Sequence, residues 1–321
     1  MAKFRALYTD YPWADAEVER AILAEADCEL IESPDNQEET LARLAPGMDA
    51  LLACWAPVSA RVIDAADCCR HIARTGIGLD NIDVSHATER GIVVTNVPNY
   101  CTEEVAEHTI ALLLALARKV GAYHLATKAG RYDLVADLPV ERVAGKTLGL
   151  IGLGAIGAAV AAKAMPLGLR VIGTNRSGTA PPGVQWRPLD RVLAESDFLS
   201  LHLPLSEATS HLIGAEALAR TRPSAYLINT SRGGLVDAAA LADALRAGRI
   251  AGAALDVQDP EPPDLSVPPW NDPRVIVTPH VAFYSTEATR ELRTRVGRQV
   301  VDVLRGARPD NVVNPAVLAG R

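Results

Sequence analysis

A glycine-rich turn between an apolar strand and an alanine-rich helix constrains the fold more than any other feature of this sequence. Residues 147–151 have the continuous apolar pattern of a buried strand, and three glycines and a helical stretch over 158–165 follow. Gly152 would permit a tight turn, Gly154 would let a pyrophosphate approach the backbone, and Gly157 would let helix and strand pack closely. The alternative is a plain β-α turn. The pattern predicts a dinucleotide site at the helix N-terminus, formed by Gly152, Gly154, Ala155, Ile156 and Gly157.

Apolar segments of strand length recur on both sides of this turn, separated by helical stretches. Together with 147–151, six short strands are expected in the later part of the chain, the other five being 170–173, 198–201, 225–229, 252–255 and 275–278. Six such strands with helical crossovers are what a doubly wound, parallel dinucleotide-binding (Rossmann) domain needs. Four earlier segments predict a second parallel α/β domain, namely 4–8, 50–54, 72–75 and 92–96.

Two long helical patterns suggest where the domains divide. The length of 321 residues fits two domains. Residues 102–118, with Thr102 as a candidate cap, are apolar around most of the helix, which predicts burial between domains or subunits. The terminal helix 286–304 is expected to cross back onto the first domain. We therefore expect one domain of residues 1–100 plus 285–321, a second of residues 101–284, and a ligand cleft between them.

Charge and composition argue against several classes of function. The formal net charge is −7 and lysine and arginine form no block, whereas a nucleic-acid surface needs a basic stripe. The longest apolar run, 110–117, is far shorter than the roughly 20 residues that span a bilayer. The N-terminus does not resemble a signal peptide. The five cysteines show no C-x-x-C pair and no metal-ligand spacing. We expect a cytoplasmic protein with reduced thiols that binds no metal, membrane or nucleic acid.

The end of the strand 170–173, which follows the glycine-rich turn and its helix, indicates which dinucleotide binds. NAD sites usually place an acid about 20 residues beyond the first glycine, on the ribose hydroxyls. Here no Asp or Glu occurs between Gly152 and Asp190, and the strand runs into Asn175, Arg176 and Ser177. These side chains could bind a 2′-phosphate. The alternative is that Arg176 is a solvated loop residue and Asn175 bonds the ribose of NAD. The sequence favours NADP(H) over NAD(H).

Three polar groups follow the ends of later strands, where ligands of open α/β sheets bind. Arg232 lies between a hydroxyl-bearing run and two glycines, and Glu261 stands between prolines in a loop after Asp256. His280 follows the last strand. Reduction of a ketone needs a proton delivered to the forming alkoxide, which histidine can supply near neutral pH, and a neighbouring carboxylate stabilises the imidazolium. Taken singly, each would more often be a surface or structural residue.

Taken together, these motifs resemble the D-isomer-specific 2-hydroxyacid dehydrogenase family over nearly the whole chain. The resemblance implies that Arg232 anchors the substrate carboxylate and oxo group, and that Glu261 pairs with the acid–base residue His280. It implies a flavodoxin-like substrate-binding first domain, whose loop 75–81 would receive the carboxylate on backbone N–H groups of Ile77, Gly78 and Leu79. Further cofactor contacts are expected from Thr109, His202, Leu203, Pro204, Thr230 and Asp256.

Finer details look like the branch that contains the C-terminal-binding proteins, which are dehydrogenase-like corepressors. Residues 280–285 carry this likeness, although that branch commonly has a tryptophan where this chain has Phe283. Trp55 stands where many relatives have polar or basic residues. Both Trp55 and Phe283 are expected to contact substrate. Because both depart from the family pattern, the size of substrate that the site prefers stays open.

The sequence thus predicts NAD(P)H-dependent reduction of a 2-oxo acid to a D-2-hydroxy acid by a homodimer. Arg232, Glu261 and His280 would carry the chemistry. An alternative is a cofactor-sensing interaction protein like the corepressors, without turnover. The side chain of the oxo acid cannot be named from the sequence.

Overall fold

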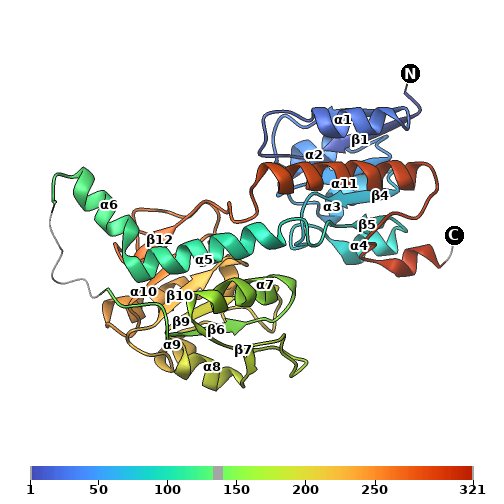
Figure 1. Ribbon diagram of the computed structural model, residues 1–321. Helices are drawn as coiled ribbons and strands as arrows, with labels where there is room; N and C mark the ends of the chain where they lie inside the picture. The colour runs from blue at the N-terminus through green and yellow to red at the C-terminus, as the bar shows by residue number, and fades with distance from the viewer. Residues whose placement is uncertain (1, 133–139, 320–321) are drawn as a thin grey trace. The chain divides into compact units, whose positions relative to one another are not determined.

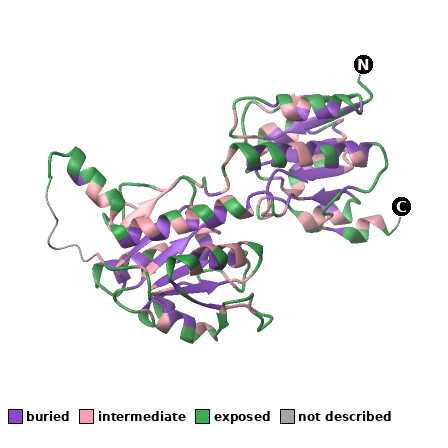
Figure 2. Cartoon of the chain, in the orientation of Figure 1, coloured by how far each residue is buried: buried purple, intermediate pink, exposed green. Residues whose placement is uncertain are grey.

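The computed structural model describes residues 2–132 and 140–319, and its chain forms two compact units (Figure 1). The first unit comprises Met1–Tyr100 and Ser285–Arg321, and the second comprises Cys101–Tyr284. Each unit is built on its own parallel sheet. In both, most strand residues are buried and the helices keep one exposed face (Figure 2).

The sheet of the first unit has the strand order β2-β1-β3-β4-β5, and every pairing is parallel. This is the flavodoxin-like order. Its strands are β1 Phe4–Tyr8, β2 Cys28–Glu32, β3 Ala50–Ala53, β4 His71–Arg74 and β5 Val93–Thr95. Helices α1 Glu17–Ala24, α2 Glu38–Leu44, α3 Ala60–Ala65 and α4 Val84–Glu89 connect them. Strand β2 was not predicted, because it lies at the sheet edge and its glutamates, Glu29 and Glu32, are not buried.

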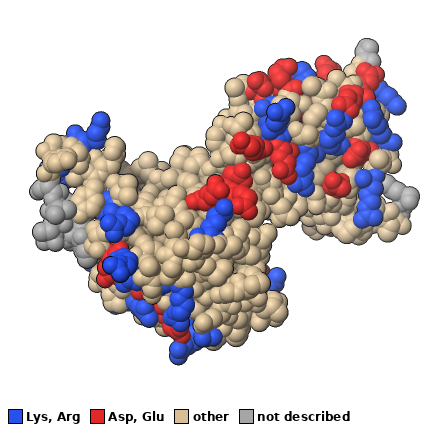
Figure 3. Space-filling model, viewed as in Figure 1, with Lys and Arg blue, Asp and Glu red and all other residues tan. Residues whose placement is uncertain are grey.

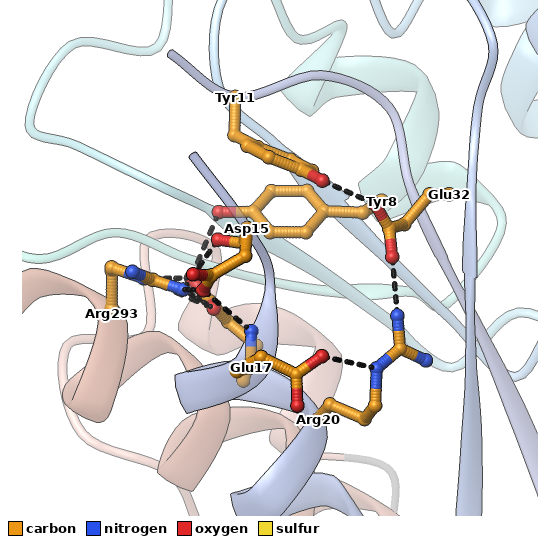
Figure 4. Close-up of polar contacts among 8 residues, drawn as sticks. Tyr8, Tyr11, Asp15, Glu17, Arg20, Glu32 and Arg293 are labelled. Atoms are coloured by element: carbon orange, nitrogen blue, oxygen red, sulfur yellow. Dashed lines mark hydrogen bonds and ion pairs between the residues drawn. The ribbon is translucent and has the colours of Figure 1, made fainter. Parts of the chain in front are cut away.

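The C-terminal helix α11, Thr286–Leu304, belongs to the first unit, and a short 3₁₀ turn, Pro315–Leu318, follows it. A buried ion pair fixes α11 against α1 (Figure 4). Glu19 is fully buried in α1 and accepts hydrogen bonds from Arg293 Nε at 3.0 Å and Nη2 at 2.7 Å. The Tyr8 hydroxyl, 3.2 Å away, also donates to Glu19. The side chains of residues 292, 296 and 300 complete the apolar face that the three-to-four-residue spacing predicts.

The second unit carries a seven-stranded parallel sheet in the order β12-β11-β10-β9-β6-β7-β8. Counted from β6, this is the Rossmann order 3-2-1-4-5-6 with one strand added beyond the sixth. The strands are β6 Thr147–Ile151, β7 Arg170–Thr174, β8 Gln185–Trp186, β9 Phe198–Leu201, β10 Tyr226–Asn229, β11 Gly252–Leu255 and β12 Val275–Val277. All six predicted strands are present within a residue at each end. Strand β8 escaped prediction because it has only two residues, both exposed.

Six α-helices of the second unit lie within its described residues. They are α5 Thr102–Arg118, α6 Val120–Lys128, α7 Ala155–Ala164, α8 Leu189–Glu195, α9 Ala215–Ala219 and α10 Ala238–Arg246, with 3₁₀ turns at Met165–Leu167 and Gly233–Leu235. Helix α5 packs against α7, β10 and β11. Cys101, one residue before the predicted cap, holds the N-cap position of α5. Helix α7 begins at Ala155, three residues earlier than expected, because Gly154 takes its N-cap position.

Among the described residues, no single helix is both long and apolar enough to cross a bilayer. Within this described part of the chain, α5 and α6 taken together reach the necessary length and hydropathy, but they form a pair bent by 63°. On the face of the chain drawn in Figure 3, lysine and arginine side chains are interspersed with aspartate and glutamate.

Candidate active site

The glycine turn after β6 leaves space at one position and is tightly packed at the other two. Gly152 has φ +102°, and a Cβ there would lie 2.0 Å from the His202 carbonyl oxygen. A Cβ on Gly157 would lie 2.2 Å from the Gly152 carbonyl oxygen. In contrast, a Cβ on Gly154 would meet no atom within 4 Å. The open side of Gly154, at the N-cap of α7, therefore fits a pyrophosphate on the helix N-terminus.

His202 directly follows β9 and lies beside this turn. Strand β9 is the neighbour of β6 on the side opposite β7. Its backbone N–H donates to the Ile151 carbonyl at 2.7 Å, and its Nε2 lies 2.9 Å from Ser200 Oγ. Burial lowers the pKa of His202 to about 4, so the ring is neutral near pH 7. Its Nδ1 is buried without a hydrogen-bond partner in the described chain. Because β6 lies between β7 and β9, turn and histidine mark the point where the strand order reverses.

The segment after β7 contains the residues predicted to contact the 2′ position of the ribose. Asn175 Nδ2 donates to the Thr179 carbonyl at 2.7 Å, and Ser177 Oγ lies 2.7 Å from Thr179 Oγ1. Asn175 Oδ1 is buried and accepts no hydrogen bond from the described residues. Arg176 is exposed and forms no ion pair or hydrogen bond within the described chain. Its guanidinium is thus available to an external anion.

His280 and Glu261 form a hydrogen-bonded pair in the loops after β12 and β11. His280 Nδ1 lies 2.9 Å from Glu261 Oε2, and Glu261 Oε1 accepts the Gln258 N–H at 2.8 Å. Burial alone would raise the pKa of Glu261, but the His280 hydrogen bond and charge, the Gln258 N–H and the Arg232 guanidinium together hold it below its ordinary value. Glu261 is therefore an anion near neutral pH and orients the imidazole through Nδ1.

Asp256 fixes the backbone on which His280 is carried. Its side chain is buried, and its carboxylate accepts hydrogen bonds from Thr278 Oγ1 at 2.6 Å, the Val281 N–H at 3.0 Å and the Ala282 N–H at 2.9 Å. The His280 N–H donates to the Asp256 carbonyl at 2.7 Å. The structure thus shows Asp256 supporting the loop 278–282, and its predicted contact with cofactor stays a prediction.

Arg232 follows β10, and its loop packs directly against the loop that bears Glu261. A Cβ on Gly233 would lie 2.0 Å from the Gln258 carbonyl oxygen, which shows how closely the two loops approach. Asn229 holds the arginine loop through a hydrogen bond from Nδ2 to the Arg232 carbonyl at 2.8 Å. The predicted cofactor residues Thr230 and Thr109 meet behind it, with their Oγ1 atoms 3.0 Å apart. Arg232, Glu261 and His280 therefore come together at one edge of the sheet.

The predicted substrate residues of the first unit follow β3 and β4. Asn96 Nδ2 donates to the Ile77 carbonyl at 2.8 Å, and Arg74 Nε donates to the Gly78 carbonyl at 2.7 Å, so this loop is held by its carbonyls. Within the described residues, the N–H groups of Ile77, Gly78 and Leu79 donate no hydrogen bond. The Trp55 side chain is 41% exposed. Phe283, in the second unit, lies with its ring centroid 6.4 Å from that of His280.

The family follows from a match that covers more than half of the chain. A family model described as "D-isomer specific 2-hydroxyacid dehydrogenase, NAD binding domain" matches residues 110–282, which include the glycine turn, Arg232, Glu261 and His280. The chain belongs to the D-isomer-specific 2-hydroxyacid dehydrogenase family.

Relatives of this dehydrogenase carry several names. A glyoxylate reductase of Korarchaeum cryptofilum is 41% identical over 90% of this chain and 90% of its own length. A D-3-phosphoglycerate dehydrogenase of Methanocaldococcus jannaschii is 38% identical over 87% of this chain and 54% of its own length. Among solved structures, an acyclic imino acid reductase in complex with NADPH and D-Arg is 30% identical, with a TM-score of 0.86 over 97% of this chain and all of that chain.

Membership in the D-2-hydroxyacid dehydrogenase family confirms the predicted fold class and the predicted type of enzyme. The chain is an NAD(P)-dependent dehydrogenase that acts on CH–OH donors. The narrower placement in the corepressor-like branch stays a prediction, as do the roles of the individual residues.

Two further residues lie at the site of this dehydrogenase and were not singled out from the sequence. Gln258 donates from Nε2 to the Leu255 and Thr278 carbonyls at 3.0 and 3.1 Å, tying the ends of β11 and β12 together beside Glu261. His108 of α5 places Nε2 3.2 Å from Thr278 Oγ1. Both residues bond to Thr278, which lies 20 positions from Gln258 and 170 from His108, so no local sequence pattern marks this arrangement.

Proposed function

We propose that this dehydrogenase reduces a 2-oxo acid to a D-2-hydroxy acid. The observation that carries the proposal is the His280–Glu261 pair beside the Arg232 loop, in the unit that also holds the glycine turn. An acid–base histidine, its carboxylate and a fixed cation are the groups that carbonyl reduction requires. The glyoxylate reductase name of a relative supports the same class of substrate.

Each of these groups has a distinct proposed role. Arg232 binds the substrate carboxylate and polarises the carbonyl, and the N–H groups of Ile77 and Gly78 donate to the carboxylate. A nicotinamide cofactor held at the glycine turn before α7 would supply the hydride that reduces C2. His280 donates a proton from Nε2 to the carbonyl oxygen, because Glu261 holds Nδ1 and stabilises the positive ring before transfer. Asp256 positions His280 by fixing the loop that follows β12.

NADP(H) is the cofactor we propose, in preference to NAD(H). Residues 174–178 contain no acid that would repel a 2′-phosphate, and Arg176 is exposed next to the buried, unpartnered Oδ1 of Asn175. A planar guanidinium matches the geometry of phosphate. The solved imino acid reductase contains NADPH. The pyrophosphate would lie against Gly154 and the first residues of α7, and Thr109, Thr230 and residues 202–204 remain the other proposed cofactor contacts.

We also propose that the active form is a homodimer in the cytoplasm. The family resemblance supports the dimer, and helix α6 exposes two large apolar residues, Val120 by 58% and Leu125 by 70%, that a partner would cover. The proposed partner is a second copy of this chain.

The deciding experiment is an assay of the purified protein with NADPH and NADH over a panel of 2-oxo acids. Oxidation of the reduced cofactor, followed by its absorbance, is expected with at least one acid and to be faster with NADPH. Tight cofactor binding without turnover of any acid would overturn the proposal and favour the cofactor-sensing alternative.

A further inference from the structure

Few positive groups reach the carboxyl edge of the first unit's sheet. Arg293 and Arg295 of α11 contact its loops, but Arg293 is paired with Glu19 and Asp15, and Arg295 with Glu291. Ligands of open α/β sheets bind outside this edge, at the point where the strand order reverses. The loops that follow the five strands contain no lysine or arginine; they are residues 9–16, 33–37, 54–59, 75–83 and 96–101. The same loops carry five aspartates, at positions 10, 15, 35, 80 and 83.

One of these aspartates occupies an anion-binding arrangement of backbone at the reversal point between β1 and β3. Asp10 follows β1, and its carboxylate accepts the N–H groups of Cys54, Trp55 and Ala56 after β3, at 3.2, 2.9 and 3.0 Å. Successive N–H groups that converge in this way form a concavity suited to an anion. The chain fills it with its own carboxylate.

The same contacts fix the turn that presents Trp55. Asn81 Nδ2 donates to the carbonyls of Cys54 and Ala56 at 3.2 and 2.9 Å, so the turn is held through its N–H groups by Asp10 and through its carbonyls by Asn81. The Trp55 side chain remains 41% exposed. A large apolar ring is therefore offered at this edge on a rigid backbone.

The cation nearest in sequence to these loops is turned into its own loop. Arg74, the last residue of β4, is 8% exposed. Its Nε donates to the Gly78 carbonyl at 2.7 Å, and its Nη1 donates to the Thr75 carbonyl. A Cβ on Gly76 would lie 2.5 Å from Nη1, so the guanidinium lies directly under the backbone of this loop.

We propose that the substrate is a 2-oxo acid whose only anionic group is its C1 carboxylate, and that Asp10 is the positioning residue that sets this preference. This inference rests on the proposed function. A second carboxylate or a phosphate at this edge would lose water, would find no lysine or arginine in the loops themselves, and would face the Asp10 carboxylate. An uncharged side chain would instead gain contact with the Trp55 ring. The proposal separates this chain from its relative named for phosphoglycerate.

Matched pairs of substrates test the preference. The first pair is 2-oxohexanoate and 2-oxoglutarate, which are similar in length. The second pair is hydroxypyruvate and 3-phosphohydroxypyruvate, which share the same carbon skeleton. The two members of each pair differ by one anionic group. We expect kcat/KM for the uncharged member to be higher by about tenfold or more, which corresponds to about 1.4 kcal/mol. Equal or faster turnover of the charged members would overturn the inference and leave the proposed function intact. Turnover of no 2-oxo acid would remove the proposed function, and the inference with it.

Substitution of Asp10 tests its role as a positioning residue. In Asp10→Ala the turn loosens and the N–H groups become available, so KM for 2-oxohexanoate should rise about fivefold with kcat within about twofold. The ratio of kcat/KM for 2-oxohexanoate to that for 2-oxoglutarate should fall by a similar factor. Asp10→Asn removes the charge but keeps an acceptor for the turn, and guards against misfolding of the alanine variant. Asp10→Asn should also lower the ratio of kcat/KM for 2-oxohexanoate to that for 2-oxoglutarate.

Asp35→Ala is the matched control, because it removes one aspartate of the same edge whose carboxylate accepts hydrogen bonds from the Gln37 N–H and from Thr40 Oγ1. Its KM values and substrate preference should equal those of the wild type. A preference left unchanged in both Asp10 variants, or altered as much by Asp35→Ala, would contradict the assignment.

Discussion

His280 has a backbone conformation that non-glycine residues rarely adopt, with φ +52°. Such a residue costs of the order of 1–3 kcal/mol and persists only where the surroundings hold it. Here the Asp256 carbonyl accepts the His280 N–H, and the Asp256 carboxylate holds the two residues that follow. Residues in strained conformations cluster at functional sites because they aim a side chain. In this chain the imidazole is aimed at Glu261.

The first prediction concerns the residues assigned to the chemistry. His280→Ala removes the proton donor and Arg232→Ala removes the cation that polarises the carbonyl, so each should lower kcat by roughly 100-fold or more. Cofactor affinity, measured by fluorescence titration, should stay within about threefold of the wild type, because the glycine turn is unaltered. Turnover at the wild-type rate in either variant would refute its assigned role.

The second prediction concerns cofactor choice. Arg176→Ala should lower the ratio of kcat/KM for NADPH to that for NADH by about tenfold, because a charged hydrogen bond to the 2′-phosphate is lost. Arg246→Ala, at an exposed position of α10, serves as the control and should leave the ratio unchanged. If Arg176→Ala also leaves it unchanged, Arg176 is a solvated loop residue and NAD(H) becomes the favoured cofactor.

At the scale of elements, the sequence predicted best where a buried strand leads into a turn of required chemistry. Strand β6 and the turn that follows it were correctly placed, because backbone packing dictates a glycine at positions 152 and 157 and the pattern of three glycines is specific. Strands β2 and β8 lie at sheet edges, where burial imposes little pattern. Arg232, Glu261 and His280 were singled out from the strand ends and loops that carry them together with the family resemblance, and their roles stay predictions. The support given by Asp256 and His108 could not be predicted, because it depends on contacts between residues far apart in the chain.

The third prediction separates the two roles of glycine in the α7 turn. Gly157→Ala should lower the melting temperature by several degrees or abolish soluble expression, because its Cβ would overlap the Gly152 carbonyl. Gly154→Ala should fold with a melting temperature near that of the wild type, since its Cβ meets no protein atom. It should nevertheless weaken cofactor binding by about tenfold. Equal losses of stability in the two variants would refute the assignment of Gly154 to the cofactor.

The fourth prediction is an acid-side loss of stability in the first unit, caused by His71 of β4. Burial lowers the pKa of His71 from 6.5 to about 3, and its Nε2 lies 2.9 Å from Thr95 Oγ1. Because the folded-state pKa is depressed, the unfolded chain binds the extra proton first. The stabilising contribution is therefore complete above pH 6.5 and is lost as the pH falls towards about 3.

Urea unfolding at neutral pH and at about pH 5 measures this effect. One proton corresponds to a slope of ~1.4 kcal/mol per pH unit within the window. His71→Gln should show a shallower slope than the wild type. His124→Gln, which changes an exposed histidine of α6, should not. If His71→Gln shows the same dependence of unfolding free energy on pH as the wild type, His71 does not cause the loss of stability in acid.

At the scale of the whole molecule, each unit places its chemistry at the carboxyl edge of a parallel sheet. The second unit presents a glycine turn, an arginine and a histidine–glutamate pair there, and the first presents donor N–H groups and an aromatic ring. The two edges differ in charge, because the loops of the first unit that follow its strands contain no lysine or arginine. Under the proposed function, the second unit carries the groups for reduction.

The fifth prediction concerns assembly. Light scattering after size exclusion should give about twice the 34.1 kDa of one chain. Leu125→Glu should shift the equilibrium towards the monomer, because Leu125 is 70% exposed on α6. A monomeric wild type at micromolar concentration would contradict the proposed dimer.

The most direct test of the account is the product formed from 2-oxohexanoate and the reduced cofactor, resolved by chiral chromatography. We predict D-2-hydroxyhexanoate in a one-to-one ratio with cofactor oxidised, and loss of this product in His280→Ala. Formation of the L enantiomer, or cofactor oxidation without any hydroxy acid, would contradict it.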